Sequence, residues 1–333
     1  MEAMGRRLAM ARNTARRGAY AADMDFFAWQ GEARKCLADL LGMDTFTACD
    51  LSVEKEWTRE GDGYIETRLT FQTEDNYRAV AHVLIPKGAA LPVPVMICLQ
   101  GHTKGMHISM GRVKYLGDAR SIADEQDFAR QCVSRGIAAI ALEQRGFGER
   151  GGTRKGPDCA HLALTALCLG RTLIGERVWD VMRALDMVEE AFPEIDARRI
   201  GIMGHSGGGT ATIYAASLDE RLFAAISSCA LCGFAESIIA IRHCACNYVP
   251  SVMRWYDMGD LCGLIAPRPL VIVSGTDDEI FPIDSAKREF AAAEALYRAS
   301  GAADRLSHAI GRGGHRFYAE AAWKRFLALT KIA

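Results

Sequence analysis

Short apolar runs alternate with longer segments of helical spacing along most of the chain after residue 90. Almost every residue of 93–99 and 137–142 is apolar, as is typical of strands that are buried on both faces of a sheet. Strands that alternate with helices of this length pair in parallel through right-handed crossovers. The pattern therefore predicts a doubly wound, mostly parallel α/β sheet flanked by helices. Further strands are expected at 199–203, 223–228, 269–273 and 306–310, and helices at 128–135, 162–191, 285–299 and 317–330.

The first 86 residues follow two other patterns. Apolar residues between Phe26 and Leu41 recur at steps of three and four, which is helical spacing, and Gly42 closes the run. We therefore expect residues 1–48 to form an N-terminal helical extension. Residues 50–86 instead alternate roughly in steps of two, with polar turns between three segments, and this predicts an antiparallel meander that leads into the sheet.

Residues 230–266 interrupt the regular alternation. They are irregular in pattern and rich in Cys, Met, Trp and Tyr. An insertion of this kind is a natural lid or pocket wall. Met253, Trp255 and Tyr256 could shape a pocket there, although residues of these types more often belong to a core.

A glycine-rich turn joins the expected strand at 199–203 to a segment of helical character. From Gly204 to Gly208 it spells Gly-x-Ser-x-Gly, which between a strand and a helix is typical of a nucleophile elbow. Such a turn pushes the hydroxyl of Ser206 clear of the sheet, and glycines on either side avoid the collision that a Cβ would cause. The sequence therefore predicts Ser206 as a catalytic nucleophile.

A serine nucleophile needs a base, and the base needs a carboxylate that orients it. In elbow enzymes the acid comes before the histidine in the chain. Asp277, Asp278 and Glu279 follow the expected strand at 269–273, where a catalytic acid would lie. Asp278 is favoured because it completes the pattern Gly-x-x-Asp-x-x-x-Pro, and Asp277 is the reserve.

A histidine in a glycine-rich loop follows the last expected strand. The glycines allow this loop to present the imidazole of His315 across the top of the sheet, and a core role explains such a setting poorly. We therefore predict His315 as the general base, which gives the required chain order of Ser206, Asp278 and His315. Five further histidines are assigned no role beyond packing or surface exposure: His82, His161, His205, His243 and His308.

The oxyanion of the reaction needs two preorganised N–H donors. The first is expected from the backbone of Gly207, directly after the nucleophile. The second is expected from the loop after the strand at 93–99, where the backbone N–H of His102 is the candidate. Lys104 and His107 either line the entrance to the site or lie in a solvated loop.

Composition narrows the class of protein. Half of the 333 residues are apolar, 24% are charged and the formal net charge is −1, so neither nucleic acid nor an anionic membrane is an expected partner. No apolar run reaches 18 residues, and the arginines near the N-terminus are followed by no signal-like apolar region. The odd number of cysteines, 11, is typical of free thiols in a reducing compartment, so a cytoplasmic location is expected.

One group of cysteines could suggest a metal. Cys229-x-x-Cys232 is followed by Cys244-x-Cys246, with His243 alongside, and thiolates so spaced can hold zinc. However, Cys229 ends an expected buried strand, and Cys-x-Cys is tight for two ligands of one tetrahedral site. We therefore predict neither a bound metal nor a cofactor.

Five motifs together resemble the α/β-hydrolase superfamily, most of all its dienelactone-hydrolase-like and acetyl-xylan-esterase-like branch. The resemblance covers about residues 75–330 and implies an α/β-hydrolase catalytic domain over 49–333. Members of this branch commonly have His-Gly-x in the oxyanion loop, where this chain has Gln-Gly-His. The motifs are the elbow, Gln100-Gly101-His102, Arg145-Gly146-Phe147-Gly148, Gly275-Thr276-Asp277-Asp278-x-x-x-Pro282 and Gly313-Gly314-His315.

The residues and the resemblance imply a serine esterase that cleaves a small-molecule carboxylic ester through an acyl-enzyme. The same triad could serve a peptidase, an amidase or a C–C bond hydrolase, and a non-catalytic binding protein on this fold is a third reading. Peptidases of this type usually carry a propeller or another gating domain, and no repeat is present here. A C–C hydrolase would cover a ring substrate with the N-terminal helices and residues 230–266. Homo-oligomerisation is left open.

Overall fold

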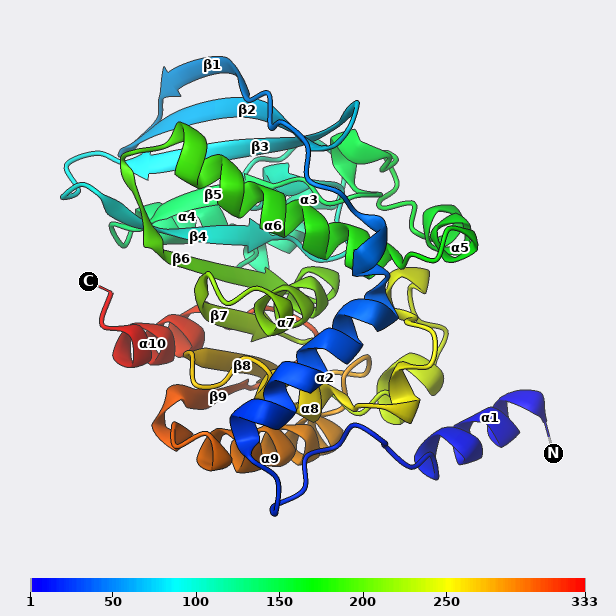
Figure 1. The fold of residues 1–333 in the computed structure, drawn as a ribbon. Helices are drawn as coiled ribbons and strands as arrows, with labels where there is room; N and C mark the ends of the chain where they lie inside the picture. Colours follow the sequence, from blue (N-terminus) through cyan, green and yellow to red (C-terminus); the bar gives the residue numbers. More distant parts are fainter. Residues whose placement is uncertain (1, 333) are drawn as a thin grey trace.

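A nine-stranded β-sheet forms the centre of the molecule in a computed structural model that describes residues 2–332 (Figure 1). Its strands are β1 (Glu54–Glu60), β2 (Tyr64–Glu74), β3 (Tyr77–Pro86), β4 (Val93–Leu99), β5 (Ala138–Leu142), β6 (Ile195–His205), β7 (Leu222–Ser228), β8 (Leu270–Gly275) and β9 (Leu306–Gly311). Their order across the sheet is β1-β2-β3-β5-β4-β6-β7-β8-β9. The pairs from β1 to β5 are antiparallel and those from β5 to β9 are parallel. The predicted mostly parallel sheet with an antiparallel start is confirmed.

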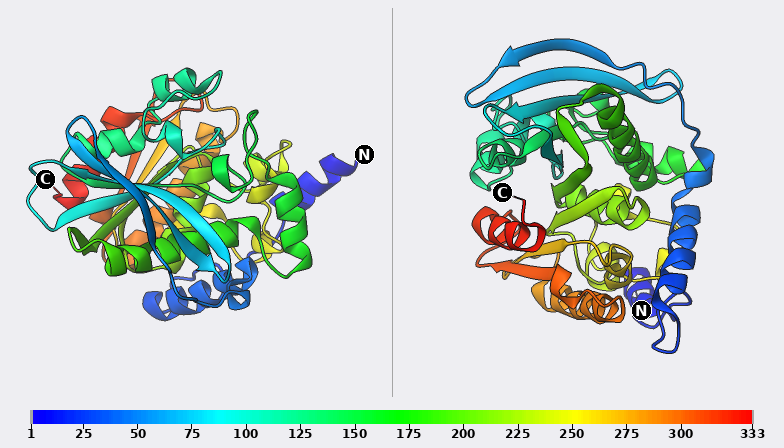
Figure 2. Two further views of the ribbon diagram at one scale, coloured as in Figure 1. Left: turned by 90° about the horizontal axis from the view of Figure 1, so that it is seen from above. Right: turned by 60° about the vertical axis from the view of Figure 1, so that its left-hand side comes forward.

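Helices cover both faces of the sheet, and Figure 2 shows the two layers. They are α1 (Ala3–Arg12), α2 (Phe26–Leu41), α3 (Asp118–Ala123), α4 (Phe128–Val133), α5 (Ala160–Cys168), α6 (Leu173–Ala191), α7 (Gly207–Leu218), α8 (Met258–Gly263), α9 (Ile283–Ala299) and α10 (Ala319–Thr330). α4 and α10 pack on one face, α6, α7 and α9 pack on the other, and α2 lies outside α7. α1 projects from the body of the molecule and buries no residue (Figure 1). Within residues 2–332, no helix is both long and apolar enough to cross a membrane.

The central strands are buried on both faces, as their apolar sequences predict. In β4, Val95 and Ile97 belong to the core beneath α6 and α7, while Met96 and Cys98 belong to the core beneath α4 and α10. A parallel sheet that is covered in this way leaves its strand ends as the places where polar side chains can gather. The ends of β4, β6, β8 and β9 therefore carry the candidate site.

Two helical predictions are sharpened by the structure. α2 ends where predicted, and Gly42 caps it in the left-handed conformation with φ 75°. The segment 162–191 forms two helices, α5 and α6, with a break at Gly170, which also has a φ of 75°. α2 packs into the same core as the sheet, and the domain boundary at residue 48 stays a prediction.

Residues 230–266 form a π-helical turn, two short 3-10 turns and α8 rather than one regular element. Residues 241–244 line the cavity described below. Trp255 and Tyr256 border a groove along α2 instead, and Tyr256 belongs to the core. Both roles considered for these aromatic side chains thus hold in part, since they pack against the core and border this groove but not the cavity, and a lid function of the segment stays a prediction.

A buried charge cluster holds the loop after β5 to α6. Arg145 donates three hydrogen bonds to the carboxylate of Asp180, with N–O distances of 2.8–3.2 Å, and Arg150 donates to the same carboxylate. Arg145 also donates to Glu74 at the end of β2, over 2.7 Å. Asp180 and both arginines are buried. The cluster therefore fixes the loop that follows a central strand to the helix that covers it.

Asp180→Asn should lower the free energy of unfolding by about 3–5 kcal/mol, because it leaves two buried guanidinium groups without their common counter-charge. Urea denaturation followed by circular dichroism measures this change. Glu190→Gln is the matched control, since Glu190 lies exposed on the same helix and its substitution should change the free energy by less than about 0.5 kcal/mol. Equal effects of the two substitutions would contradict the role given to Asp180.

Candidate functional site

Ser206 occupies a sharp turn between β6 and α7. It is the residue between the last one of the strand, His205, and the first one of the helix, Gly207. Its backbone has φ 54° and ψ −121°, a combination that residues with a Cβ rarely adopt. The N–H of Ser206 donates to the carbonyl of Ser228 at the end of β7 over 2.8 Å, which helps to hold the turn. The sequence therefore folds here into the strained elbow that the motif predicted.

The two glycines of the motif are required by close backbone contacts. A Cβ on Gly204 would overlap the carbonyl oxygen of Gly208, and a Cβ on Gly208 would overlap that of Leu99 at the end of β4. The start of α7 thus lies directly against the backbone of two neighbouring strands. Only glycine allows this approach, which is why the pattern Gly-x-Ser-x-Gly accompanies the turn.

Asp278 and His315 form a hydrogen-bonded pair beside this turn. The Nδ1 of His315 lies 2.8 Å from one carboxylate oxygen of Asp278, and the other oxygen accepts the backbone N–H groups of Ile280 and Phe281 over 2.9 and 3.0 Å. Burial acts to raise the pKa of Asp278, but the hydrogen bond and charge of His315 and the two N–H donors outweigh it and lower that pKa below its ordinary value. Asp278 is therefore an ionised partner for the imidazole. Asp277, the alternative acid, is exposed, and within residues 2–332 no hydrogen bond joins it to His315.

Ser206 and His315 line one cavity of about 400 Å³. The ring of His315 lies between those of His205 and Phe281, with centroids 4.7 and 5.9 Å away. Within residues 2–332, no hydrogen bond joins the hydroxyl of Ser206 to His315, and such contacts often tighten only when a substrate is bound. The other residues that line the cavity are Gly101, His102, Thr103, Ser121, Gln126, His205, Ile241, Arg242, His243, Cys244 and Ile280.

The two expected oxyanion donors belong to neighbouring segments. Gly207 is the first residue of α7, so its N–H has no acceptor within the helix. The imidazole of His102 packs directly on Gly207, at the place where a Cβ of that residue would lie. The structure therefore brings the loop after β4 against the start of α7, as the sequence predicted, and His102 and Ser206 border the same cavity.

A buried carboxyl group anchors the loop after β4. Glu143, directly after β5, accepts hydrogen bonds from the side-chain amide of Gln100 over 2.7 Å and from the N–H of Met106 over 3.0 Å. Burial raises the pKa of Glu143 to about 7. Glu143 was not singled out from the sequence, because its contacts depend on strands β4 and β5 being neighbours.

Both expectations for His107 are wrong, and Lys104, a partly exposed loop residue, is not among the residues that line the cavity. Neither residue lines the cavity, and His107 is only 3% exposed rather than part of a solvated loop. Its Nε2 lies 2.8 Å from the carboxylate of Asp118, which also accepts the N–H groups of Lys114 and Tyr115. This pair ties the loop after β4 to the first residue of α3.

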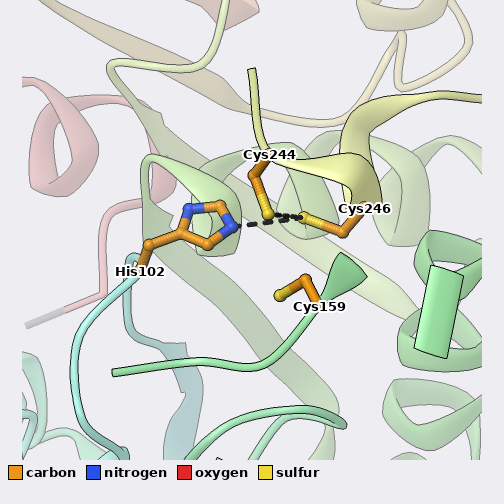
Figure 3. Close-up of side chains that lie close together, drawn as sticks. All are labelled: His102, Cys159, Cys244 and Cys246. Atoms are coloured by element: carbon orange, nitrogen blue, oxygen red, sulfur yellow. Dashed lines mark hydrogen bonds between the residues drawn. The ribbon is translucent and has the colours of Figure 1, made fainter. Parts of the chain in front are cut away.

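The cysteines considered for a metal are separated by the fold. Cys229 lies beside Asp278 and His315, and Cys232 is buried elsewhere. Cys244 and Cys246 instead meet His102 and Cys159, and Figure 3 shows these four side chains facing one another. Cys159 carried no motif in the sequence, and His243, which stood beside the pair, is directed toward the ring of Phe281. All 11 cysteines are free thiols in the structure.

Several known proteins are similar to this chain. The model of the abhydrolase family matches residues 4–309. The chain is 27% identical over 292 residues to "Putative hydrolase YtaP" of Bacillus subtilis, which is 86% of this chain and 94% of that protein. Its fold matches a "putative acetyl xylan esterase" of Bacteroides fragilis with a TM-score of 0.78, 21% identity and coverage of 94% of this chain and 82% of the other. It also matches a glucuronoyl esterase from Solibacter usitatus with a TM-score of 0.66, 18% identity and coverage of 93% and 94%.

The stability of the protein should depend on pH through Glu143. Its pKa of about 7 in the folded chain lies above the ordinary value of 4.5, so the folded state holds this proton more tightly than the unfolded state. The free energy of unfolding should therefore fall as the pH rises from about 4.5 to about 7, by up to about 3 kcal/mol from this group. Glu143→Gln cannot ionise and should lose this part of the pH dependence. Urea denaturation at about pH 5 and about pH 8 measures it. The same pH dependence in the variant and the native protein would contradict the assignment.

Proposed function

The chain belongs to the abhydrolase family, and on that basis we propose that it is a serine esterase that hydrolyses carboxylic esters with Ser206, His315 and Asp278. One observation carries the proposal: a serine in a strained strand–helix turn shares a cavity with a histidine whose Nδ1 is held by a buried carboxylate. The acetyl xylan and glucuronoyl esterases with a similar fold support an ester as the substrate.

The reaction follows from the roles of these three side chains. Asp278 holds His315 with its Nδ1 protonated, which leaves Nε2 free to accept the proton of Ser206 as its Oγ attacks the ester carbonyl carbon. The N–H groups of Gly207 and His102 donate to the oxyanion of the tetrahedral intermediate. His315 then returns the proton to the leaving alcohol, and an acyl-enzyme remains on Ser206.

Water completes the cycle by the same steps. His315 accepts a proton from a water molecule as its oxygen attacks the acyl carbon, and the second tetrahedral intermediate collapses to the carboxylic acid and free Ser206. The negative charge of Asp278 stabilises the imidazolium form of His315 in both halves of the reaction. The low pKa of Asp278 suits this role, because the carboxyl group remains ionised while the histidine is charged.

The cavity favours a small ester with polar groups. Its lining contains Arg242, His243, Gln126 and Thr103, which can donate hydrogen bonds to oxygens of a substrate.

Hydrolysis rates on matched aryl ester, anilide and diketone substrates separate the esterase from the amidase and C–C hydrolase alternatives. The proposal requires the ester to be the preferred substrate.

Ser206→Ala should abolish turnover of a short-chain aryl ester, because no nucleophile remains, while thermal stability stays near that of the native protein. A fluorophosphonate probe should label the native protein on Ser206 and should not label the variant, as mass spectrometry of the labelled peptide would show. Ser228→Ala is the matched control, because Ser228 is a buried serine at the end of the neighbouring strand β7. This substitution removes a hydroxyl group but leaves the nucleophile in place. Undiminished turnover by Ser206→Ala would refute the assignment of Ser206.

Asp278→Asn should reduce kcat by about 10⁴-fold, because the amide no longer holds His315 in the required tautomer. Asp277→Asn is the matched control, since it changes the neighbouring exposed carboxylate and should leave kcat within about threefold. Steady-state kinetics on the same aryl ester compare the two. A larger loss in Asp277→Asn than in Asp278→Asn would assign the catalytic acid to Asp277 instead.

A further inference from the structure

Three thiols and an imidazole converge beside the cavity from three separate segments of the chain (Figure 3). His102 comes from the loop after β4, Cys159 from the residue before α5, and Cys244 and Cys246 from the 3-10 turn Ala245–Asn247 and the residue before it. The Nε2 of His102 lies 3.2 Å from the Sγ of Cys246, which lies 3.3 Å from the Sγ of Cys244. All four donor atoms lie within 4.8 Å of one another.

These distances suit a tetrahedral metal centre. Zinc binds thiolate sulfur at about 2.3 Å and imidazole nitrogen at about 2.0 Å, so the ligand atoms of such a centre are about 3.5–3.8 Å apart. Two of the donor pairs in this cluster are slightly closer than this, at 3.2 and 3.3 Å, and the other donor atoms are at most 4.8 Å apart. Rotations of the side chains are therefore enough to bring all four donor atoms to one metal ion. Cys159 and Cys246 are buried and the other two residues are half-buried, so the centre would be shielded from solvent.

The charge of a neighbouring arginine gives an independent reason for an anion at this place. Arg177 on α6 is only 1% exposed, and its guanidinium donates to the backbone carbonyl of Arg145 over 2.7 and 3.1 Å and to the Sγ of Cys159 over 3.2 Å. No carboxylate of residues 2–332 forms an ion pair with it, although a guanidinium remains charged when buried and buried charges need a partner. The guanidinium also lies over the ring of Phe147, 4.6 Å from its centroid, but neutral thiols would leave it without a negatively charged partner.

We propose that His102, Cys159, Cys244 and Cys246 bind one thiophilic divalent metal ion, for which Zn²⁺ is the best fit, in a closed structural site beside the catalytic cavity. Three thiolates and a divalent cation carry a net charge of −1, which the charge of Arg177 balances. Four protein ligands complete a tetrahedron and leave no position for a substrate, as in structural rather than catalytic zinc sites. The three thiols lose their protons to solvent when the ion binds.

The ion would join the two walls of the cavity. His102 lies in the expected oxyanion loop and its ring packs on Gly207, while Cys244 follows directly on Arg242 and His243, which also line the cavity. A metal bound to His102, Cys244 and Cys159 would fix the oxyanion loop and residues 242–244 relative to each other. The proposal thus adds a structural centre to the chain and stands independently of the reaction at Ser206.

A disulfide accounts for the cluster less well. One disulfide would use two of the three thiols and would leave the third thiol and His102 without a partner. It would also carry no negative charge to compensate Arg177. A metal centre uses all four donors and supplies that charge.

The metal content of the full chain, purified without chelators and measured by inductively coupled plasma mass spectrometry, tests the proposal. About one zinc ion per chain is expected, with a fall of at least about tenfold in Cys159→Ala and in His102→Ala. His102→Cys should retain the metal, because it replaces one zinc ligand with another. Cys168→Ala is the matched control and should keep the full metal content, since Cys168 is an exposed thiol at the end of α5.

A measurement on the native protein covers the case in which the variants fail to fold. X-ray absorption at the zinc edge should give three sulfur neighbours at about 2.3 Å and one nitrogen neighbour, and the protein reconstituted with Co²⁺ should show the charge-transfer and d–d absorption of a tetrahedral thiolate site. Native protein that binds neither Zn²⁺ nor Co²⁺, or intact mass spectrometry that finds a disulfide between two of the three cysteines, would overturn the proposal. Neither result would bear on the esterase assignment, because the ester assays and the fluorophosphonate label report on Ser206, His315 and Asp278, and none of these residues is a proposed metal ligand.

Discussion

The contact between the start of α7 and the ends of its neighbouring strands is the constraint on which the rest of the site depends. Gly208 lies against the carbonyl of Leu99 in β4, and the N–H of Ser206 donates to Ser228 in β7. The helix therefore begins in the groove between strands, and the turn before it has no room for a relaxed serine. The strained φ and ψ of Ser206 are the consequence, and they direct its hydroxyl into the cavity.

Buried carboxyl groups then hold the loops around that turn. Asp180 draws the loop after β5 onto α6, and Glu143 fixes the loop after β4 through Gln100 and Met106. Glu143 lies at the carboxyl end of β5, and Asp180 reaches from α6 to the loop that follows the same strand, where side chains and backbone N–H groups of separate segments meet. The precision of the site thus comes from polar contacts between loops, while the apolar layers beneath them keep the strands in register.

The cavity is assembled from segments far apart in sequence. His315 follows β9, His102 follows β4, and His243 lies in the irregular segment between β7 and α8. Side chains such as Phe234, Ile238 and Val252 anchor the irregular segment in the core, but its residues 241–244 border the cavity. A metal ion shared by His102, Cys159, Cys244 and Cys246 would add coordination bonds to these apolar contacts.

Local patterns in the sequence determined the alternation of strands and helices, the elbow at Ser206 and the order of Asp278 and His315, because each depends on residues close together in the chain. Glycine spacing, apolar runs and strand-end acids are signals of that kind. Which residues meet across the molecule was decided only by the tertiary structure. His107 turned inward to Asp118 rather than toward solvent, and Cys244 and Cys246 joined Cys159 and His102 rather than Cys229 and Cys232. The physical reason is that such contacts depend on the order of strands in the sheet and on the paths of its loops. Neither of these produces a periodic pattern of residues in the sequence.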